Sequence, residues 1–216
     1  SSLVNPVAPI INSIEVPDDF KYLAVIESSL VNAVSPAGAR GVWQFMPATA
    51  KEKGMEVSDE VDERYHLEKS TEAACKYLLG AKEKFGSWTL AAASYNGGMS
   101  GISKKMEEQQ VDNYYDLLLT EETSRYVFRI LALKEIMSKS DKYGFSIPKE
   151  ALYYTIPTKK IVVDSSITDL AKFAKIQGVN YKILKIRNPW LRDKKLTNTS
   201  GKKYEIEIPT SGYNKQ

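Results

Sequence analysis

The chain has 216 residues, 43% of them hydrophobic, and its 30 basic and 27 acidic side chains give a formal net charge of +3. The hydrophobic content is sufficient for a packed core and excludes a wholly disordered chain, and the nearly balanced charge gives no indication of nucleic-acid binding. Cys75 is the only cysteine and His66 the only histidine, so an intrachain disulfide is excluded, no metal site or cofactor is expected, and any acid/base chemistry should come from carboxylates, tyrosines or lysines.

The first part of the chain is predicted to be mainly helical. Asp18 or Asp19 can cap a helix whose apolar residues recur at helical spacing, and the loop at residues 32–41, with its Ser, Pro and Gly residues, should follow that helix. Thr120 precedes two glutamates that suit the first turn of a helix running to about Ser138. Further helices are predicted over residues 47–54, 68–85 and 88–95, the last of them ended by Gly97-Gly98.

A small module with a different composition is predicted at the C-terminal end. Residues 152–163 are rich in β-branched and aromatic side chains, with Pro157 between two short runs, and residues 204–208 alternate apolar and polar side chains as a strand with one exposed face does. Helices predicted over residues 166–176 and 181–186 separate these two segments. The expected order is strand, helix, helix, strand, in a unit of roughly 60 residues.

Glu27 is a candidate acid/base group on residue chemistry alone. It lies near the end of the first predicted helix, directly after the apolar residues 23–26. Apolar surroundings raise the pKa of a carboxyl, as a general acid near neutral pH requires. The alternative is an ordinary solvated helix glutamate, and on this observation alone it is the better interpretation, because the chain has many glutamates.

Four motifs in chain order favour the interpretation of Glu27 as an acid/base group over that of a solvated glutamate. The first is Glu27-Ser28, and the second runs from Ser35 through Gly41-Val42-Trp43-Gln44-Phe45-Met46-Pro47. The third is Ser94-Tyr95-Asn96-Gly97-Gly98, and the fourth is Glu122-Thr123-Ser124-Arg125-Tyr126-Val127. Over roughly residues 20–145, the chain thereby resembles the lytic transglycosylases of the goose-lysozyme-like superfamily (the SLT-domain, glycoside hydrolase family 23 type), most closely the membrane-bound lytic transglycosylase D group. Ser94 and Gly97 stand where that family usually has alanine.

The resemblance implies a mainly α fold, with a lysozyme-like helical catalytic domain followed by a small α+β module. We place an N-terminal extension at residues 1–17, the lytic transglycosylase domain at residues 18–147 and the module at residues 148–216. The β-α-α-β order of the module is similar to a degenerate LysM glycan-binding module, in which Val163-Asp164-Ser165-Ser166-Ile167 replaces the usual Gly-Asp-Thr-Leu loop.

The resemblance also implies an activity, the cleavage of the β-1,4 bond between N-acetylmuramic acid and N-acetylglucosamine without added water, which gives a 1,6-anhydro product. Carried onto this chain, Glu27 would be the single acid/base group, and the substrate's acetamido group would replace the second carboxylate of ordinary glycosidases. Tyr126 would donate a hydrogen bond near the acetamido group, and Ser35 would bond close to Glu27 or the sugar. The other expected saccharide-binding side chains are Gln44, Phe45, Met46, Tyr95 and Asn96, and structural roles near the site are expected for Ser28, Gly41 and Glu122.

Peptidoglycan glycan strands are the expected partner, and nucleic acid is not. We expect a monomer that is periplasmic or associated with the outer membrane of a bacterium. No run of about 18 apolar residues is present, so no transmembrane segment is predicted. Two alternatives stay open, a hydrolytic muramidase of the same fold and a non-catalytic peptidoglycan-binding protein. The joint presence of Glu27, Ser35, Gln44, Tyr95, Asn96 and Tyr126 argues against the second.

Overall fold

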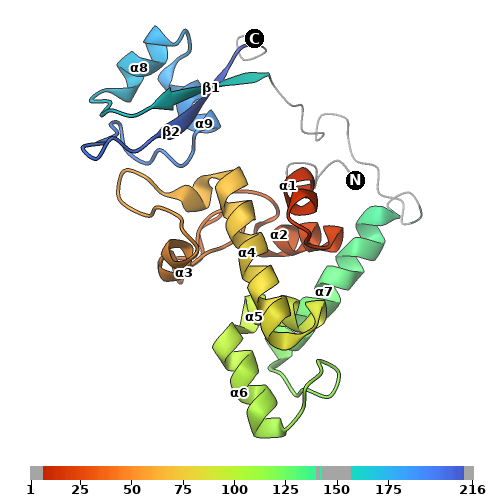
Figure 1. The fold of residues 1–216 in the computed structure, drawn as a ribbon. Helices are drawn as coiled ribbons and strands as arrows, with labels where there is room; N and C mark the ends of the chain where they lie inside the picture. Colours follow the sequence, from red (N-terminus) through yellow and green to blue (C-terminus); the bar gives the residue numbers. More distant parts are fainter. Residues whose placement is uncertain (1–6, 140–141, 143–156, 212–216) are drawn as a thin grey trace.

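The computed structural model describes residues 7–139, 142 and 157–211, which form a larger helical unit and a small unit built on a two-stranded antiparallel sheet (Figure 1). The helical unit consists of α1 (Ala8–Ser13), η2 (Asp18–Phe20), α2 (Lys21–Ser28), α3 (Pro47–Glu52), η3 (Glu63–Tyr65), α4 (Leu67–Phe85), α5 (Trp88–Gly97), α6 (Met99–Gln109) and α7 (Glu121–Ser138). The small unit consists of β1 (Thr158–Val163), α8 (Leu170–Ile176), α9 (Tyr181–Arg187) and β2 (Tyr204–Pro209). The predicted mainly α fold with a β-α-α-β module is confirmed. Among the described helices, none is long and apolar enough to cross a membrane.

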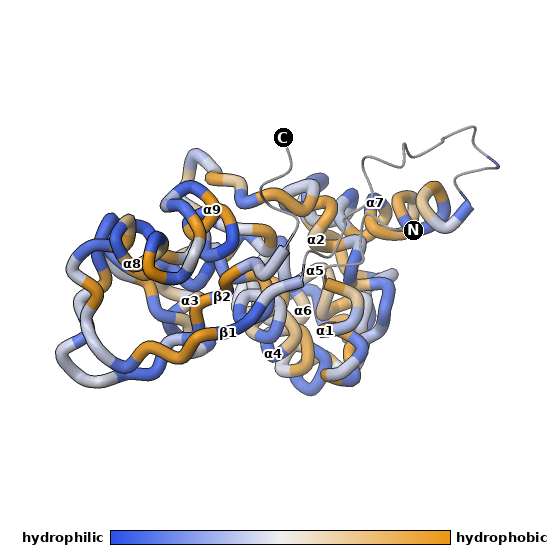
Figure 2. Tube along the Cα trace, turned by 90° about the horizontal axis from the view of Figure 1, so that it is seen from above, coloured by the Kyte–Doolittle hydropathy of each residue, from blue (hydrophilic) through white to orange (hydrophobic). Residues whose placement is uncertain are grey.

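The core of the helical unit surrounds α5, in which the consecutive residues 90–94 are all buried. The other long helices contribute one buried face each, and hydrophobic and hydrophilic stretches alternate along them (Figure 2), as expected for amphipathic helices. Trp43 is the largest of the fully buried side chains, and its Nε1 donates to Thr71 Oγ1 on α4 (2.8 Å). Val7 and Ile11 are also buried in this core, so the described part of the expected extension at residues 1–17 packs with the helical unit.

Side-chain caps fix the beginnings of several helices. Ser87 Oγ accepts a hydrogen bond from the backbone N–H three residues later at the start of α5 (3.1 Å), and Thr120 Oγ1 does the same for α7 (3.3 Å). His66, which precedes the helix predicted over residues 68–85, is the N-cap of α4, where its Nδ1 accepts from the Lys69 N–H (3.2 Å). Helices α1 and α6 were not predicted.

The predicted cap of α2 by Asp18 or Asp19 is wrong. Helix α2 follows directly on η2, and its N-cap residue Phe20 makes no side-chain cap. The Asp18 carboxylate instead pairs with Lys21 (2.5 Å), and the Asp19 carboxylate pairs with Lys134 of α7 (2.8 Å). Asp19 therefore connects the beginning of α2 to α7, the helix that carries the fourth motif.

Strands β1 and β2 pair in an antiparallel register that runs from Thr158 opposite Pro209 to Val163 opposite Tyr204. The apolar residues of β2 are buried, as their alternation with polar residues predicts. Residues 152–156 of the predicted first strand, like the predicted boundary between residues 147 and 148, lie outside the described residues.

Helix α8 begins at Leu170 and not at the predicted residue 166. The Asp169 carboxylate accepts hydrogen bonds from the backbone N–H groups of the next two helical positions (3.0 and 3.1 Å), which makes it the N-cap. The residues before Asp169 are not helical, and Ile167 forms a β-bridge with Leu196. The predicted helix therefore wrongly included part of the loop before α8.

The two units share a hydrophobic boundary. Val61 and Tyr65 belong to the chain segment before α4, yet they are buried in the core of the small unit together with Trp190 and Leu191. A β-bridge joins Val61 to Leu191 in the same place. The small unit is thus packed on the segment between α3 and α4 (Figure 1).

Candidate active site

Glu27 and Tyr126 meet where α2 packs against α7. Glu27 is the next-to-last residue of α2 and is half-buried, while Tyr126 lies buried in the second turn of α7. The Tyr126 hydroxyl donates a hydrogen bond to Glu27 Oε1 at 2.6 Å. Two motifs that lie 99 positions apart in the sequence therefore contribute directly interacting side chains.

Burial raises the pKa of Glu27 above its ordinary value, and this is the largest influence on it. The Tyr126 hydrogen bond and the charge of Arg129 lower the pKa by stabilising the ionised form, and the charge of Glu122 raises it. Burial, followed by the neighbouring Glu27 charge, holds the pKa of Tyr126 well above its usual value, so its hydroxyl keeps its proton. The result is a carboxyl that holds a proton more tightly than usual, beside a neutral hydrogen-bond donor.

Ser28 fixes the end of α2 to the second motif. Its side chain is buried, and its Oγ donates to the backbone carbonyl of Val42 (2.6 Å), with a longer contact to the carbonyl of Ala24 (3.2 Å). The helix ends directly afterwards, because Ser29 has a left-handed backbone conformation (φ 56°). The backbone of Glu27 is therefore held at a fixed place relative to the turn at residues 41–46.

Gly41 and Gln44 shape that turn. Gly41 has φ +84°, and a Cβ at this position would lie 1.9 Å from the carbonyl oxygen of Arg64, so only glycine fits. Gln44 also has a positive φ (54°), and its Nε2 donates to the backbone carbonyls of Ala33 (3.0 Å) and Gly41 (2.8 Å). The structure thus gives the Gln44 amide a part in closing the loop, in addition to the saccharide contact expected from the sequence.

Ser35 is engaged within its own loop. Its Oγ accepts a hydrogen bond from the Ala39 N–H (2.9 Å), and its backbone carbonyl accepts from the Gly38 N–H (3.0 Å). Among the hydrogen bonds of the described residues, none joins Ser35 to Glu27, so the structure does not bring these two expected site residues into direct contact.

Tyr95 connects α5 to the second motif. Its hydroxyl donates to the backbone carbonyl of Trp43 (2.6 Å), and its ring packs edge-on against the rings of Phe45 and Trp43, with centroids 6.2 and 6.3 Å away. Phe45 is buried, whereas Met46 is 42% exposed.

Asn96 connects α5 to α7. Its Oδ1 accepts from Thr123 Oγ1 (2.9 Å), and its Nδ2 donates to Glu122 Oε1 (3.3 Å). The four motifs therefore meet in one place. Arg129, whose charge acts on Glu27, was missed by the sequence reasoning, although it lies one helical turn after Tyr126 on the same face of α7.

A cavity of ≈ 350 Å³ opens at the junction of the two units, and Leu30, Val42, His66 and Trp190 are among the residues that line it, whereas Glu27 is not. The candidate active site is therefore placed by the chemistry of Glu27 and its contacts and not by this cavity. Among the described residues, no group of three or more His, Cys, Asp or Glu side chains could hold a metal ion.

Two family models match separate parts of the chain. Residues 15–117 match the transglycosylase SLT domain, and residues 159–212 match the C-terminal LysM-like domain of soluble lytic transglycosylases. The first range includes Glu27, the 41–47 segment and Asn96, and the second coincides with the small unit.

Two curated relatives that align with most of this chain agree with these matches. The chain is 29% identical over 199 residues to membrane-bound lytic murein transglycosylase D of Escherichia coli K12 and, with the same values, to that of Escherichia coli O6:H1. These alignments cover 89% of the chain and 43% of each relative, so the chain spans less than half the length of these relatives. Among solved structures, an inactive mutant of the lytic transglycosylase Slt from Pseudomonas aeruginosa matches with a TM-score of 0.52 and 17% identity, covering 69% of this chain and 26% of that one, which is a likeness of fold.

Proposed function

The chain carries a transglycosylase SLT domain followed by a LysM-like domain of the lytic transglycosylase type, and from this premise we propose that it cleaves the glycan strands of bacterial peptidoglycan as a lytic transglycosylase. The observation that supports this proposal most strongly is the contact between Glu27 and Tyr126 (2.6 Å), because it combines a carboxyl of raised pKa with a neutral donor. The place of action is then the bacterial cell envelope, in the periplasm or at the outer membrane.

Glu27 acts twice in the proposed reaction. In the first step its carboxyl gives a proton to the glycosidic oxygen, and the bond from this oxygen to the anomeric carbon of N-acetylmuramic acid breaks. In the second step the 6-hydroxyl of the same sugar bonds to that carbon, and the Glu27 carboxylate takes up the hydroxyl proton. No water is consumed, the product is a 1,6-anhydro sugar, and Glu27 is protonated again.

The raised pKa suits both steps. Burial keeps Glu27 protonated at a pH where an exposed glutamate has lost its proton, so the acid form is available. After proton transfer, the Tyr126 hydroxyl and the nearby Arg129 charge stabilise the carboxylate until it accepts the second proton. We assign saccharide contacts to Met46 and to the exposed edges of Gln44 and Asn96, with Tyr95 supporting the turn through its hydrogen bond to the Trp43 carbonyl.

Digestion of purified sacculi followed by mass spectrometry tests this proposal. We expect released glycan fragments that are one water lighter than the hydrolytic products. Fragments with the full mass would assign the chain to the muramidases, and binding to sacculi without release of fragments would assign it to the non-catalytic binding proteins.

A further inference from the structure

Asp62 and Arg64 form a buried ion pair outside the four motifs. Both side chains are 4% exposed, and the contact is bidentate, from Arg64 Nε to Asp62 Oδ1 (2.9 Å) and from Nη2 to Oδ2 (2.8 Å). Removing two charges from water costs free energy that their attraction often only offsets, so stability alone does not explain such a pair. Its further contacts give it another role.

Arg64 contacts both loops of the second motif. Its Nη1 donates to the backbone carbonyl of Gly38 (3.1 Å) and to the backbone carbonyl of Phe45 (3.1 Å). Its own carbonyl oxygen lies against Gly41, where a Cβ would come within 1.9 Å of it. One side chain with its backbone therefore holds the loop at residues 35–41 and the turn at residues 41–46 against each other.

These loops lead directly to Glu27. Between the two carbonyls that Arg64 holds lies Val42, whose carbonyl accepts the hydrogen bond from Ser28, the residue after Glu27 (2.6 Å). The neighbouring carbonyl of Trp43 accepts from Tyr95. A displacement of the turn would therefore reach the end of α2 through a single hydrogen bond.

The small unit holds the backbone on which Arg64 sits. The Asp62 N–H donates to the backbone carbonyl of Trp190 (2.9 Å), and the Arg192 N–H donates to the carbonyl of Glu60 (2.8 Å). The guanidinium of Arg192 also lies over the ring of Tyr65, 4.0 Å from its centroid.

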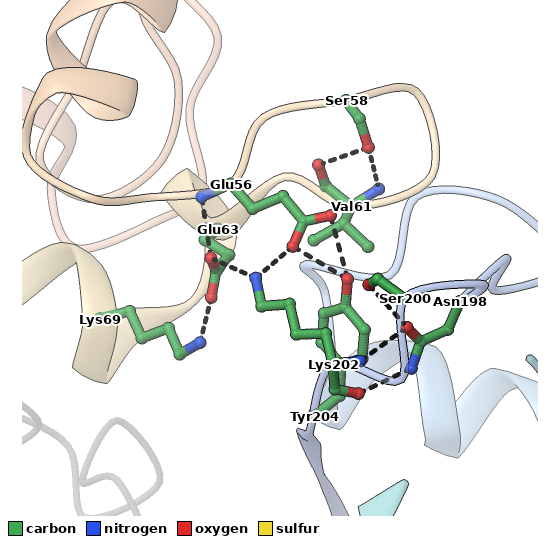
Figure 3. A network of polar contacts seen from close by, with 9 residues as sticks. All are labelled: Glu56, Ser58, Val61, Glu63, Lys69, Asn198, Ser200, Lys202 and Tyr204. Atoms are coloured by element: carbon green, nitrogen blue, oxygen red, sulfur yellow. Dashed lines mark hydrogen bonds and ion pairs between the residues drawn. The ribbon is translucent and has the colours of Figure 1, made fainter. Parts of the chain in front are cut away.

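A polar network completes this contact (Figure 3). The Glu56 carboxylate accepts from the Tyr204 hydroxyl (2.9 and 3.0 Å) and pairs with Lys202, while Glu63 pairs with Lys69 and with Lys202 (3.9 Å). Two residues of β2 and the loop before it thus hold the same segment, residues 56–64, that carries Asp62 and Arg64.

We propose that Arg64 is a positioning residue, which fixes the two loops beside Glu27, and that the docked small unit holds Arg64 in place through the segment at residues 56–64. The effect on turnover that we expect from this role rests on the proposed function. The C-terminal module thereby supports the geometry of the active site, whatever its own affinity for glycan.

Arg64→Lys is the direct test. Lysine keeps the charge, but its three N–H donors on one nitrogen cannot replace the four hydrogen bonds that the planar guanidinium makes to Asp62 and the two loop carbonyls. We expect faster hydrogen exchange at the Gly38, Arg40 and Gln44 amides. We also expect kcat on sacculi to fall about tenfold or more with KM nearly unchanged, because misplacing the catalytic group affects the transition state more than binding. Lys104→Arg is the control, a charge-conserving exchange at an exposed residue of α6 that pairs with Glu108 at the surface, outside the four motifs.

A second variant tests the module without touching the helical unit. The double substitution Lys202→Met with Tyr204→Phe removes the contacts of both residues to Glu56, together with the Lys202–Glu63 pair, and keeps most of the apolar volume. We expect faster exchange at the same three amides and a smaller fall in kcat. All rates are measured at a temperature at which circular dichroism shows each variant to be folded, so a loss of folded protein does not enter them.

The outcomes separate the claims. Wild-type exchange and wild-type kcat in folded Arg64→Lys would overturn the positioning role. If that variant is impaired but the double variant equals wild type, the support from the small unit is refuted. Failure of the wild-type chain to cleave sacculi would instead refute the proposed function, and hydrogen exchange would still decide whether Arg64 holds the loops.

Discussion

At the scale of single residues, the proposed chemistry depends on two groups whose protonated forms are favoured by burial. The pKa of Glu27 is raised, and that of Tyr126 is raised well above its usual value. The hydrogen bond between them lowers the pKa of Glu27 and so opposes part of the rise caused by burial, because it stabilises the carboxylate. Tyr126 therefore sets how far the Glu27 pKa rises as well as where its carboxyl points.

Tyr126→Phe should shift the pH dependence of the reaction. Without the hydroxyl the ionised form of Glu27 loses a hydrogen bond, so its pKa rises further. The acid form of Glu27 is needed for the first step, so the high-pH limb of the kcat profile should move to higher pH, while kcat at its maximum falls about tenfold as the carboxyl loses its orientation. Tyr115→Phe, at a residue that is 83% exposed, is the control. A limb that stays in place or moves to lower pH contradicts this role.

Gly41→Ala should destabilise the protein strongly. The new Cβ would meet the Arg64 carbonyl oxygen at 1.9 Å and would also strain a backbone with φ +84°. We expect a loss of about 3 kcal/mol or more in the free energy of unfolding, measured in urea. Gly54→Ala separates the two causes, because Gly54 has φ +88° with nothing within 4 Å of a Cβ. It should cost about 1 kcal/mol, and an equal cost for the two substitutions would exclude the clash.

At the scale of secondary structure elements, local signals predicted some helices and missed others. Helices α5 and α7 were predictable because Ser87 and Thr120 cap them and glycine or polar residues follow. Helix α6 was missed because Gly97-Gly98 indicates a helix end, whereas in the structure Gly98 turns the chain (φ +78°) and α6 begins at the next residue.

Only those residues of the candidate site that lie in the four motifs could be predicted from the sequence. Glu27 and Tyr126 were predicted from the resemblance, but their contact depends on the packing of α2 against α7, which no local pattern specifies. Arg64 gave no signal at all, since its partners Gly38 and Phe45 are 26 and 19 positions away. Long-range contacts of a side chain with backbone carbonyls leave no periodicity in a sequence.

The packing of α4 on the Trp43 segment depends on a buried hydrogen bond. Thr71→Val keeps the shape of the side chain but leaves the Trp43 Nε1 donor without its partner. Both residues are fully buried, so we expect a loss of about 2 kcal/mol in the free energy of unfolding. Thr71→Ser, which keeps the hydroxyl and loses a methyl group, should lose only about 1 kcal/mol. A valine variant as stable as wild type would show that the bond contributes nothing.

At the scale of the whole molecule, the two units are joined by a shared hydrophobic core and by hydrogen bonds. Val61 and Tyr65 of the helical unit are buried in the core of the small unit, and backbone hydrogen bonds connect Glu60 and Asp62 to it. A unit of this size is near the lower limit for independent folding, and the shared core adds to the surface that it buries.

Thermal unfolding should therefore be a single cooperative transition. Scanning calorimetry is expected to give one peak whose calorimetric and van't Hoff enthalpies agree, because the core of the small unit is incomplete without Val61 and Tyr65 of the helical unit. Two resolved peaks, of which the peak of the helical unit is unaffected by the Lys202→Met and Tyr204→Phe substitutions, would show that the units unfold independently.

The central claim is that one carboxyl, that of Glu27, carries the acid/base chemistry, and turnover of purified sacculi by Glu27→Gln tests it most directly. Glutamine keeps the size of the side chain and can still contact Tyr126, so the variant should fold and bind glycan as wild type does, with turnover reduced about 10³-fold or more. Glu83→Gln, at an exposed position of α4, should digest sacculi at the wild-type rate. Release of anhydro fragments by Glu27→Gln at the wild-type rate would contradict the account.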